Sequence, residues 1–252
     1  VAVRQVSGRT DDLVTSLNAQ VQTVAQNALD GAIARSRASG NNANQGAAVV
    51  MTTTGRVVAM ASYPDYDPSV WTGGISQRQF NALFGKSGGQ PIINWTTQGQ
   101  YAPGSTFKVV TAAAALENGL YKTADEKTDS PLPWTMTGTR TQLKNEGNIP
   151  CKNATLRVAL QYSCNTVFGK VGSDLGNDKM LEEAKKFGFT EEQFTPVRSS
   201  ASVFSDDMNP SQTALSSIGQ YNTAATPLQM AMVASAVANG GTLVTPHLGK
   251  AI

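Results

Sequence analysis

The chain has 252 residues, a formal net charge of +2 and only 15% charged residues. This length is enough for one large domain with a real hydrophobic core or for two small domains. Lys and Arg are scattered, so no basic stripe predicts nucleic-acid binding, and no apolar run approaches the roughly 20 residues that cross a bilayer. With one histidine and no closely spaced cysteine pair, we expect no metal site of the zinc type.

The first third of the chain contains signals for a helix and a hairpin. We expect residues 1–15 to be extended. Residues 17–38 place apolar side chains at helical spacing, which predicts an amphipathic helix. Residues 47–64 hold two apolar runs around a turn at 54–55, which predicts a β-hairpin. The chain then becomes irregular up to residue 100, with a short helix expected near 77–84.

Helices are predicted for most of the second half. Residues 120–150 are rich in Thr, Pro and Gly and predict a long irregular excursion. Residues 153–176 predict two short helices joined near Tyr162, and residues 177–189 predict a capped amphipathic helix. Residues 226–241 are nearly all apolar and predict a buried helix that ends at a glycine. A single hairpin is too little sheet for these helices to pack on.

The stretch YAPGSTFKVVTAAAALENG, residues 101–119, delivers Ser105 to the start of an alanine-rich helix. The commonest role of a serine there is to cap the helix, and such a cap prefers Glu or Gln three residues later. This chain has Lys108 instead, facing the positive end of the helix dipole. Burial and the helix field both lower a lysine pKa. A neutral Lys108 on the same face can take the hydroxyl proton and activate Ser105.

A second group of polar side chains follows at Ser163-Cys164-Asn165, between the two predicted helices. A hydroxyl and an amide there suit a proton relay and a clamp on a substrate backbone. Each motif is weak alone, since Ser-x-x-Lys arises by chance about once per few hundred residues. Ser-x-Asn also occurs at residues 16–18 and 39–41, before Ser105, and we interpret those two as chance matches.

The two cysteines, Cys151 and Cys164, are too few for a disulfide-dense scaffold. They can form one bridge in an exported protein, or they can remain two small unlinked hydrophobic side chains. Composition leaves both possibilities open. A Ser-His-Asp triad would have to use His247, which follows a proline in a predicted loop.

Taken together, these residues resemble the penicillin-binding transpeptidases, in particular the class B, monofunctional kind, over nearly the whole chain. That superfamily carries Ser-x-x-Lys, Ser-Asp-Asn and Lys-Thr-Gly motifs. The stretch around Ser105 looks like the nucleophile helix of the family. Residues 46–68 are similar to its first strand pair and the Pro-x-x-Asp-Pro segment after it, and residues 217–241 resemble its late GQ…TPLQMA…ANGG block.

The resemblance implies an α/β (α+β) fold with an antiparallel central sheet flanked by helices. It also implies that residues 1–252 are the N-terminal and central portion of a transpeptidase domain, with the sheet incomplete in this chain. By position, Ser105 would be the acylated nucleophile and Lys108 its general base. Ser163 would pass the proton to the leaving amine, and Asn165 would hold the substrate amide and the lysine. The backbone N–H of Ser105 would be one oxyanion-hole donor.

The implied substrate is a peptidoglycan stem peptide ending in D-Ala-D-Ala. The terminal D-Ala leaves, an amine of a neighbouring strand resolves the acyl-enzyme into a cross-link, and β-lactams trap the serine. No metal or organic cofactor is implied. The family works at the extracytoplasmic face of the cell membrane, anchored in the full-length protein and beside a membrane glycosyltransferase. Disulfides persist there, which favours a Cys151–Cys164 bridge.

The chain departs from the family pattern in two places. Cys164 stands where the second motif often has Asp, and class B enzymes vary at that position. No Lys-Thr-Gly is present, and the family order places it beyond residue 252. We interpret three similar tripeptides as decoys: Lys86-Ser87-Gly88, Lys122-Thr123-Ala124 and Lys170-Val171-Gly172.

The missing motif implies that a C-terminal segment accompanies this chain, as a second polypeptide or as further residues. Without it, we expect the apolar faces of the Ser105 helix and of the 227–238 helix to lack a sheet, and a sheet edge to lie open.

Two other functions share the same acylation chemistry. A serine β-lactamase would need a group that activates the deacylating water, and within residues 120–150 only Glu126 and Glu146 are candidates. We interpret both as solvated surface charges. A non-catalytic β-lactam sensor or scaffold would become acylated without releasing D-Ala from a peptide.

Overall fold

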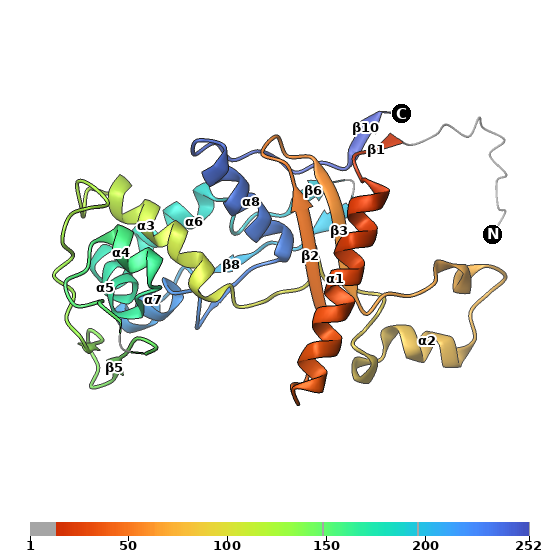
Figure 1. Ribbon diagram of the computed structural model, residues 1–252, viewed down its shortest axis with the longest axis horizontal. Coiled ribbons are helices and arrows are strands. Elements are labelled where there is room, and N and C mark those ends of the chain that lie inside the picture. Colours follow the sequence, from red (N-terminus) through yellow and green to blue (C-terminus); the bar gives the residue numbers. More distant parts are fainter. Residues whose placement is uncertain (1–13, 148, 196, 252) are drawn as a thin grey trace.

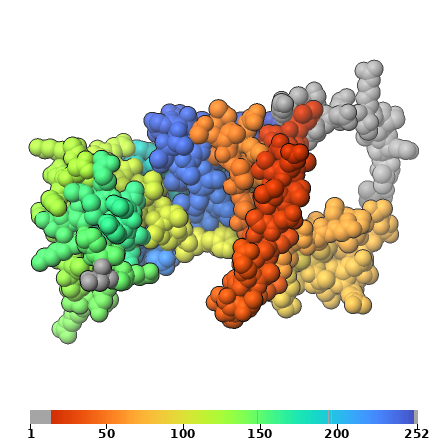
Figure 2. Space-filling model, in the orientation of Figure 1, coloured from red at the N-terminus to blue at the C-terminus, as the bar shows by residue number. Residues whose placement is uncertain are grey.

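The computed structural model describes residues 14–147, 149–195 and 197–251. In Figure 1, these residues form a helical lobe on the left and a small sheet layer to the right of it. The helix of residues 227–238 lies between the two parts, and the excursion around residues 77–84 projects furthest to the right. Figure 2 shows the same arrangement with all atoms in place.

The sheet layer is a hairpin of two antiparallel strands, β2 (Gly46–Met51) and β3 (Val57–Tyr63). Its turn includes Gly55, which has a φ of +87°, and a Cβ there would lie 2.5 Å from the backbone oxygen of Thr245. Only glycine fits such a backbone at this close approach. The hairpin predicted from the two apolar runs is confirmed.

Two helices pack on the hairpin. α1 (Ala19–Ala38) begins after Asn18, whose side chain accepts hydrogen bonds from two backbone N–H groups, and it packs mainly along β3. α8 (Pro227–Ala238) packs along β2 and buries Leu228 completely. Both helices were predicted, but α8 is buried on one side only, since Val237 is 57% exposed.

The helical lobe holds the largest hydrophobic core of the described residues. Phe107 is fully buried in this core, with its ring centroid 5.3 Å from that of Phe189 and 5.6 Å from that of Phe204. The helices of this lobe are α3 (Lys108–Glu117), α4 (Leu156–Gln161), α5 (Asn165–Leu175), α6 (Asn177–Lys186) and α7 (Pro210–Ser216). The predicted break between α4 and α5 near Tyr162 is confirmed, whereas α7 was not predicted.

The expectation that α8 lacks a sheet for its apolar face is wrong, because α8 packs along β2, whereas helices rather than a sheet cover α3. α3 packs against α5 and α6, which leave Val110, Ala114 and Ala115 with no exposed surface. α8 lies on β2. The open sheet edge that we expected is present in the described residues. β2 pairs there with β3 alone, and Val50 on β2 is 41% exposed.

The remaining elements are short. α2 (Gln77–Phe84) confirms the short helix expected near 77–84, and it begins at a capping box of Ser76 and Gln79. Of the stretch expected to be extended, residues 1–13 lie outside the described residues. Short antiparallel pairs join β1 (Val14–Thr15) with β10 (Gly249–Ala251), β4 (Trp134–Thr135) with β5 (Gln142–Leu143), β6 (Gln193–Thr195) with β7 (Val197–Ser199), and β8 (Val203–Phe204) with β9 (Thr223–Ala224).

A charged cluster joins the C-terminal ends of α3 and α6. Lys186 pairs with Glu117 and lies 3.5 Å from Oε2 of Glu183, an oxygen that makes no hydrogen bond. Only 3% of Glu183 is exposed. Burial, together with the neighbouring Glu117 carboxylate, raises the pKa of Glu183 to about 7, although Lys186 opposes the shift. In the folded chain, the Glu183 carboxyl therefore keeps its proton up to a pH of about 7.

This cluster predicts that stability falls as pH rises from about 4.5 to about 7, because the folded chain keeps a proton that the unfolded chain has released. Glu183→Gln should remove that part of the pH dependence. Urea unfolding at several pH values measures it, with Glu182→Gln as the control, since Glu182 is exposed on the same helix. An unchanged slope in Glu183→Gln would contradict the assignment.

Candidate active site

Ser105 lies in a 3-10 helix and not in the first turn of an α-helix. This helix, η3, spans Gly104–Phe107, and α3 begins only at Lys108. Neither helix has a side-chain cap, so the capping role common for a serine here is absent. Residues three apart eclipse each other in 3-10 geometry. Ser105 and Lys108 are such a pair, with the serine exposed and the lysine fully buried.

A turn after α7 holds this segment by its backbone. The N–H of Gly104 donates to the carbonyl oxygen of Gly219 at 2.9 Å, and the buried hydroxyl of Thr111 donates to the carbonyl oxygen of Ser217 at 2.6 Å. Gly219 has a φ of +73°, and a Cβ on it would lie 2.1 Å from the Gly104 oxygen. The two glycines touch so closely that no side chain fits between them.

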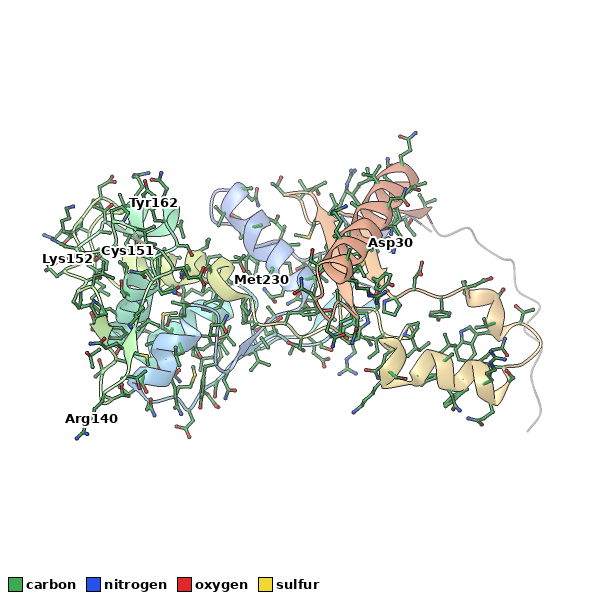
Figure 3. The ribbon with its side chains drawn as sticks, turned by 60° about the horizontal axis from the view of Figure 1, so that its bottom comes forward. Asp30, Arg140, Cys151, Lys152, Tyr162 and Met230 are labelled. Carbon is green, nitrogen blue, oxygen red and sulfur yellow. A yellow bond between two sulfur atoms is a disulfide. The ribbon has the colours of Figure 1, made fainter. Side chains whose placement is uncertain are left out.

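The second motif forms the sharp turn between α4 and α5. Ser163 has a φ of +54°, the left-handed region that non-glycine residues rarely adopt. Cys164 precedes the first turn of α5 and is joined to Cys151 by a disulfide, with both residues fully buried. The bridge predicted on the resemblance is confirmed. Figure 3 shows Cys151 and Tyr162 close together in the helical lobe.

The four predicted site residues meet around the amine of Lys108. Its Nζ lies 3.1 Å from Oγ of Ser105 and 3.0 Å from Oγ of Ser163. It also donates to the carbonyl oxygen of Ser163 at 2.8 Å and to Oδ1 of Asn165 at 2.7 Å. The hydroxyl of Ser163 donates to Oγ of Ser105 at 2.8 Å. The helices η3, α3 and α5, together with the turn before α5, thus deliver these side chains to one point.

This arrangement fits a neutral lysine. A neutral amine has two N–H groups and one lone pair. The two oxygens that can only accept, the Ser163 carbonyl and Asn165 Oδ1, can take both N–H groups. The lone pair is then left to accept a proton from a hydroxyl, either directly from Ser105 or through Ser163. The geometry can therefore deprotonate Ser105 and carry its proton to a second position.

Burial supplies the energetic reason for a neutral amine. The charged form of Lys108 is poorly solvated, which lowers its pKa from 10.5 to about 8, while the carboxylate of Glu146 raises it and so opposes part of the shift. Near pH 7 the ammonium still predominates. A proton-accepting fraction is nevertheless present, and it grows as pH rises through about 8.

Residues 144–145 belong to this site, although the sequence did not indicate them. Nδ2 of Asn165 donates to the carbonyl oxygen of Lys144 at 3.2 Å. Asn145 accepts from the N–H of Thr166 and donates to its hydroxyl, both at 3.0 Å. Both polar atoms of the Asn165 side chain are thus held, Oδ1 by Lys108 and Nδ2 by the carbonyl of Lys144. These contacts link positions 21 residues apart, so no local periodicity could have revealed them.

The other candidate residues lie in structural roles. Asn18 caps α1, and Ser39 ends it, so neither additional Ser-x-Asn match joins the site. Among the Lys-Thr-Gly decoys, Lys86 is in a short 3-10 helix and Lys170 pairs with Asp174 inside α5. His247 is exposed beside Thr245. No three His, Cys, Asp or Glu residues within the described ranges gather as metal ligands do.

Comparisons with known proteins point to one family. The family model for the penicillin binding protein transpeptidase domain matches residues 46–252. Peptidoglycan D,D-transpeptidase PbpA of Mycobacterium tuberculosis H37Rv is 34% identical over 211 residues, which are 81% of this chain and 43% of that protein. Peptidoglycan D,D-transpeptidase MrdA of Escherichia coli K12 is 32% identical over 215 residues, covering 80% and 34% of the two chains.

A solved structure agrees. Penicillin-binding protein A from M. tuberculosis, as its penicillin G acyl-enzyme complex, superposes with a TM-score of 0.82 at 30% identity, covering 94% of this chain and 54% of that one. The chain therefore belongs to the penicillin-binding protein transpeptidase family and has its mixed α/β fold. It spans less than half the length of the two curated relatives. No helix within the described ranges is long and apolar enough to cross a membrane.

The contact between Gly104 and Gly219 predicts a defect specific to the nucleophile. Gly219→Ala should slow acylation of Ser105 by benzylpenicillin on the order of 100-fold, because the turn must move by a sizeable fraction of an ångström or more. Gly240→Ala is the matched control, since Gly240 also has a positive φ but nothing within 4 Å. Equal acylation rates in the two variants would show that the Gly104–Gly219 contact does not position Ser105.

The disulfide predicts a large stability effect. It closes a loop with a sequence separation of 13, and loops of that size contribute about 3 kcal/mol to the free energy of unfolding. Cys151→Ala/Cys164→Ala, or reduction of the native protein, should lower the unfolding free energy by about that amount. Urea unfolding with and without reductant measures it. Two titratable thiols in the native, non-reduced protein would rule the bridge out.

Proposed function

We propose that this chain is the N-terminal and central part of a class B peptidoglycan D,D-transpeptidase domain. Its substrate is a stem peptide ending in D-Ala-D-Ala, and β-lactams acylate the same serine. The observation that carries this proposal is the set of contacts around Lys108 Nζ, which brings Ser105, Ser163 and Asn165 to one amine. Relatives of this chain are named D,D-transpeptidases, and a similar structure is a penicillin G acyl-enzyme.

Acylation follows from the site geometry. Oγ of Ser105 attacks the carbonyl carbon between the two D-Ala residues as its proton moves to Nζ of Lys108, and a C–O bond forms. The N–H of Ser105 lies in the first turn of η3, where helical N–H groups have no partner within the helix. We assign it to the developing oxyanion. The C–N bond then breaks, and Ser163 passes a proton to the leaving D-Ala amine.

Cross-linking reverses these steps with a different amine. The acceptor amine attacks the ester carbon, a new C–N bond forms, and the C–O bond to Ser105 breaks. The proton that the amine loses returns to Oγ of Ser105 through Ser163 and Lys108, which are 2.8 Å and 3.1 Å from it. Asn165 holds the substrate amide during both halves, while its Oδ1 fixes the lysine.

We further propose that a C-terminal segment with the Lys-Thr-Gly strand completes the domain, as further residues or as a second polypeptide. Two observations support this. β2 pairs only with β3 among the described residues. An apolar groove of about 350 Å³ lies between β2 and α8, lined by Val49, Val50, Met51 and Ala231 among others. A full-length protein would be anchored at the extracytoplasmic membrane face and would act beside a membrane glycosyltransferase.

One observation keeps serine β-lactamase as a second candidate. Glu146 is exposed, as expected of a solvated surface charge, and its carboxylate raises the pKa of Lys108. A serine β-lactamase would need such a carboxylate to activate the deacylating water. Glu126 has a structural role, because its side chain accepts the N–H of Lys122 at 2.7 Å. Rapid release of hydrolysed penicillin would favour the lactamase, and a long-lived adduct favours the transpeptidase or a non-catalytic sensor.

The test is intact mass spectrometry before and after benzylpenicillin, under native and denaturing conditions. We expect one covalent adduct that persists and is absent in Ser105→Ala. Release of D-Ala from a peptide ending in D-Ala-D-Ala separates the transpeptidase from a sensor. Denaturing spectra also show whether a second polypeptide is present. A folded chain that forms no adduct would overturn the proposal for this molecule.

The pH dependence of acylation tests the role of Lys108. The rate should rise as pH passes about 8, because only the neutral amine accepts the serine proton. Glu146→Gln should move the rise to lower pH, since it removes a charge that favours the ammonium. Lys108→Arg should abolish acylation, because guanidinium keeps its proton. A rate that is independent of pH in this range would exclude Lys108 as the base.

A further inference from the structure

A cavity of about 250 Å³ lies at the end of α3 that is remote from Lys108. It is enclosed by three neighbouring helices, α3, α6 and α8, and by the chain that follows α8 (Figure 1). An α-helix rises 1.5 Å per residue, so Glu117 at this end lies about 14 Å along the axis from Lys108. The cavity is therefore separate from the reacting residues, and the proposed reaction does not use it.

The walls of this cavity are fixed to one another. The side chain of Gln229 on α8 donates to the carbonyl oxygen of Phe187 at 2.6 Å, which joins the end of α6 to α8. The N–H of Gly241 donates to the carbonyl oxygen of Ala236 at 2.8 Å and holds the chain where it leaves α8. α3 packs directly against α6. Since each wall is joined to another, the cavity is formed before any ligand arrives.

The surface of the cavity has an apolar part and a charged part. Ala113 of α3, Ala236 of α8 and Leu243 contribute to the apolar part. Glu117, Glu183 and Lys186 lie together in the charged part. A ligand that matches both parts combines an apolar body with a polar or charged group.

The charges at this place favour a cation. Lys186 is the one cation among the described residues that line the cavity, and it pairs with Glu117. Its Nζ also lies 3.5 Å from Glu183 and 3.7 Å from Glu182. Even when Glu183 is protonated, the carboxylates outnumber the ammonium group. An anionic ligand would therefore meet a net negative charge, whereas a cation would be attracted.

Glu183 supplies a polar atom that lacks a partner. Only 3% of the residue is exposed, and among the described residues no group donates a hydrogen bond to its Oε2. The ammonium group of Lys186 donates to Glu117 instead. A buried carboxyl oxygen without a donor is unfavourable, and an N–H group placed in the cavity would relieve this cost.

We propose that this cavity binds a small primary alkylammonium compound, with the ammonium group donating to Glu183 and the aliphatic chain on the apolar part. The apolar part does not suit a metal ion, and within the described ranges no three His, Cys, Asp or Glu residues gather as metal ligands do. The inference goes beyond the proposed function, because it uses none of the reacting residues and its test needs no acylation.

Binding should strengthen as pH rises from about 6 to about 8. Burial and the Glu117 carboxylate raise the pKa of Glu183 to about 7, while Lys186 opposes the shift. The parts of α8 and of the following chain that line the cavity carry no charge. An alkylammonium ion, which like lysine keeps its proton in this range, pairs best with the ionised carboxylate. Its binding should therefore release a proton from Glu183.

The experiment is a methyl NMR titration of the whole chain with butylammonium, 1-butanol or butyrate at constant ionic strength. The three probes share an aliphatic chain and differ in charge. The methyl groups of Ala113, Ala236 and Leu243 report on the cavity directly. We expect these methyl signals to shift with butylammonium and to change little with the other two probes.

Two variants test the two parts of the cavity. Glu183→Gln should weaken butylammonium binding about tenfold and remove its pH dependence, because the ligand loses a bond to a charged group. Ala113→Leu should abolish binding by filling the apolar part while Glu183 stays. Glu182→Gln is the matched control, since it removes a charge from the same helix near Lys186 without touching the cavity wall. It should change the Kd by about twofold at most.

Four results would overturn the proposal. Equal shifts with butylammonium and 1-butanol would show that the cavity does not select for charge. Equal weakening in Glu182→Gln and Glu183→Gln would assign the effect to overall charge. Shifts of the same methyl groups with Mg²⁺ but not with butylammonium would indicate a metal site. The absence of any shift at about 100 mM butylammonium would exclude binding in a useful range. None of these results bears on acylation of Ser105, which tests the proposed function separately.

Discussion

The site depends on one buried amine. Lys108 has no exposed surface, and four oxygen atoms from Ser105, Ser163 and Asn165 surround its Nζ. Two of these oxygens can only accept, so they hold the amine in one orientation and leave its lone pair facing the hydroxyls. The rest of the helical lobe brings the parts of this arrangement together and keeps water away from the lysine.

Three contacts from distant parts of the chain fix that arrangement. The Gly104–Gly219 contact fixes the position of the turn that carries Ser105, and the disulfide of Cys164 holds the turn that carries Ser163. Asn145 then fixes the segment whose carbonyl orients Asn165. Each contact acts on the backbone or on a neighbour of a reacting residue.

Local spacing in the sequence predicted the elements with enough residues to show a period, namely α1, α8 and the β2–β3 hairpin. The Ser-x-x-Lys and Ser-x-Asn motifs indicated Ser105, Lys108, Ser163 and Asn165, but each motif is weak alone, and the resemblance to the family was needed to select them. Local spacing did not distinguish a 3-10 turn from an α-helix at Ser105, because both place residues three apart on one face. Helix α7 and the two-residue strands are too short for periodicity. The contacts of Asn145 join distant segments through an irregular one, which no local pattern encodes.

The different exposure of Ser105 and Lys108, the nucleophile and base that we propose, has a chemical consequence. A neutral amine is a stronger nucleophile than a hydroxyl, so an acyl group that reached Lys108 would form an amide, which is far harder to cleave than an ester. Ser105 is open to solvent, while Lys108 lies beneath it with its lone pair directed at hydroxyl groups. In the reaction we propose, the fold would thus confine the acyl group to oxygen, where a second amine can still remove it, and would protect the base from being consumed.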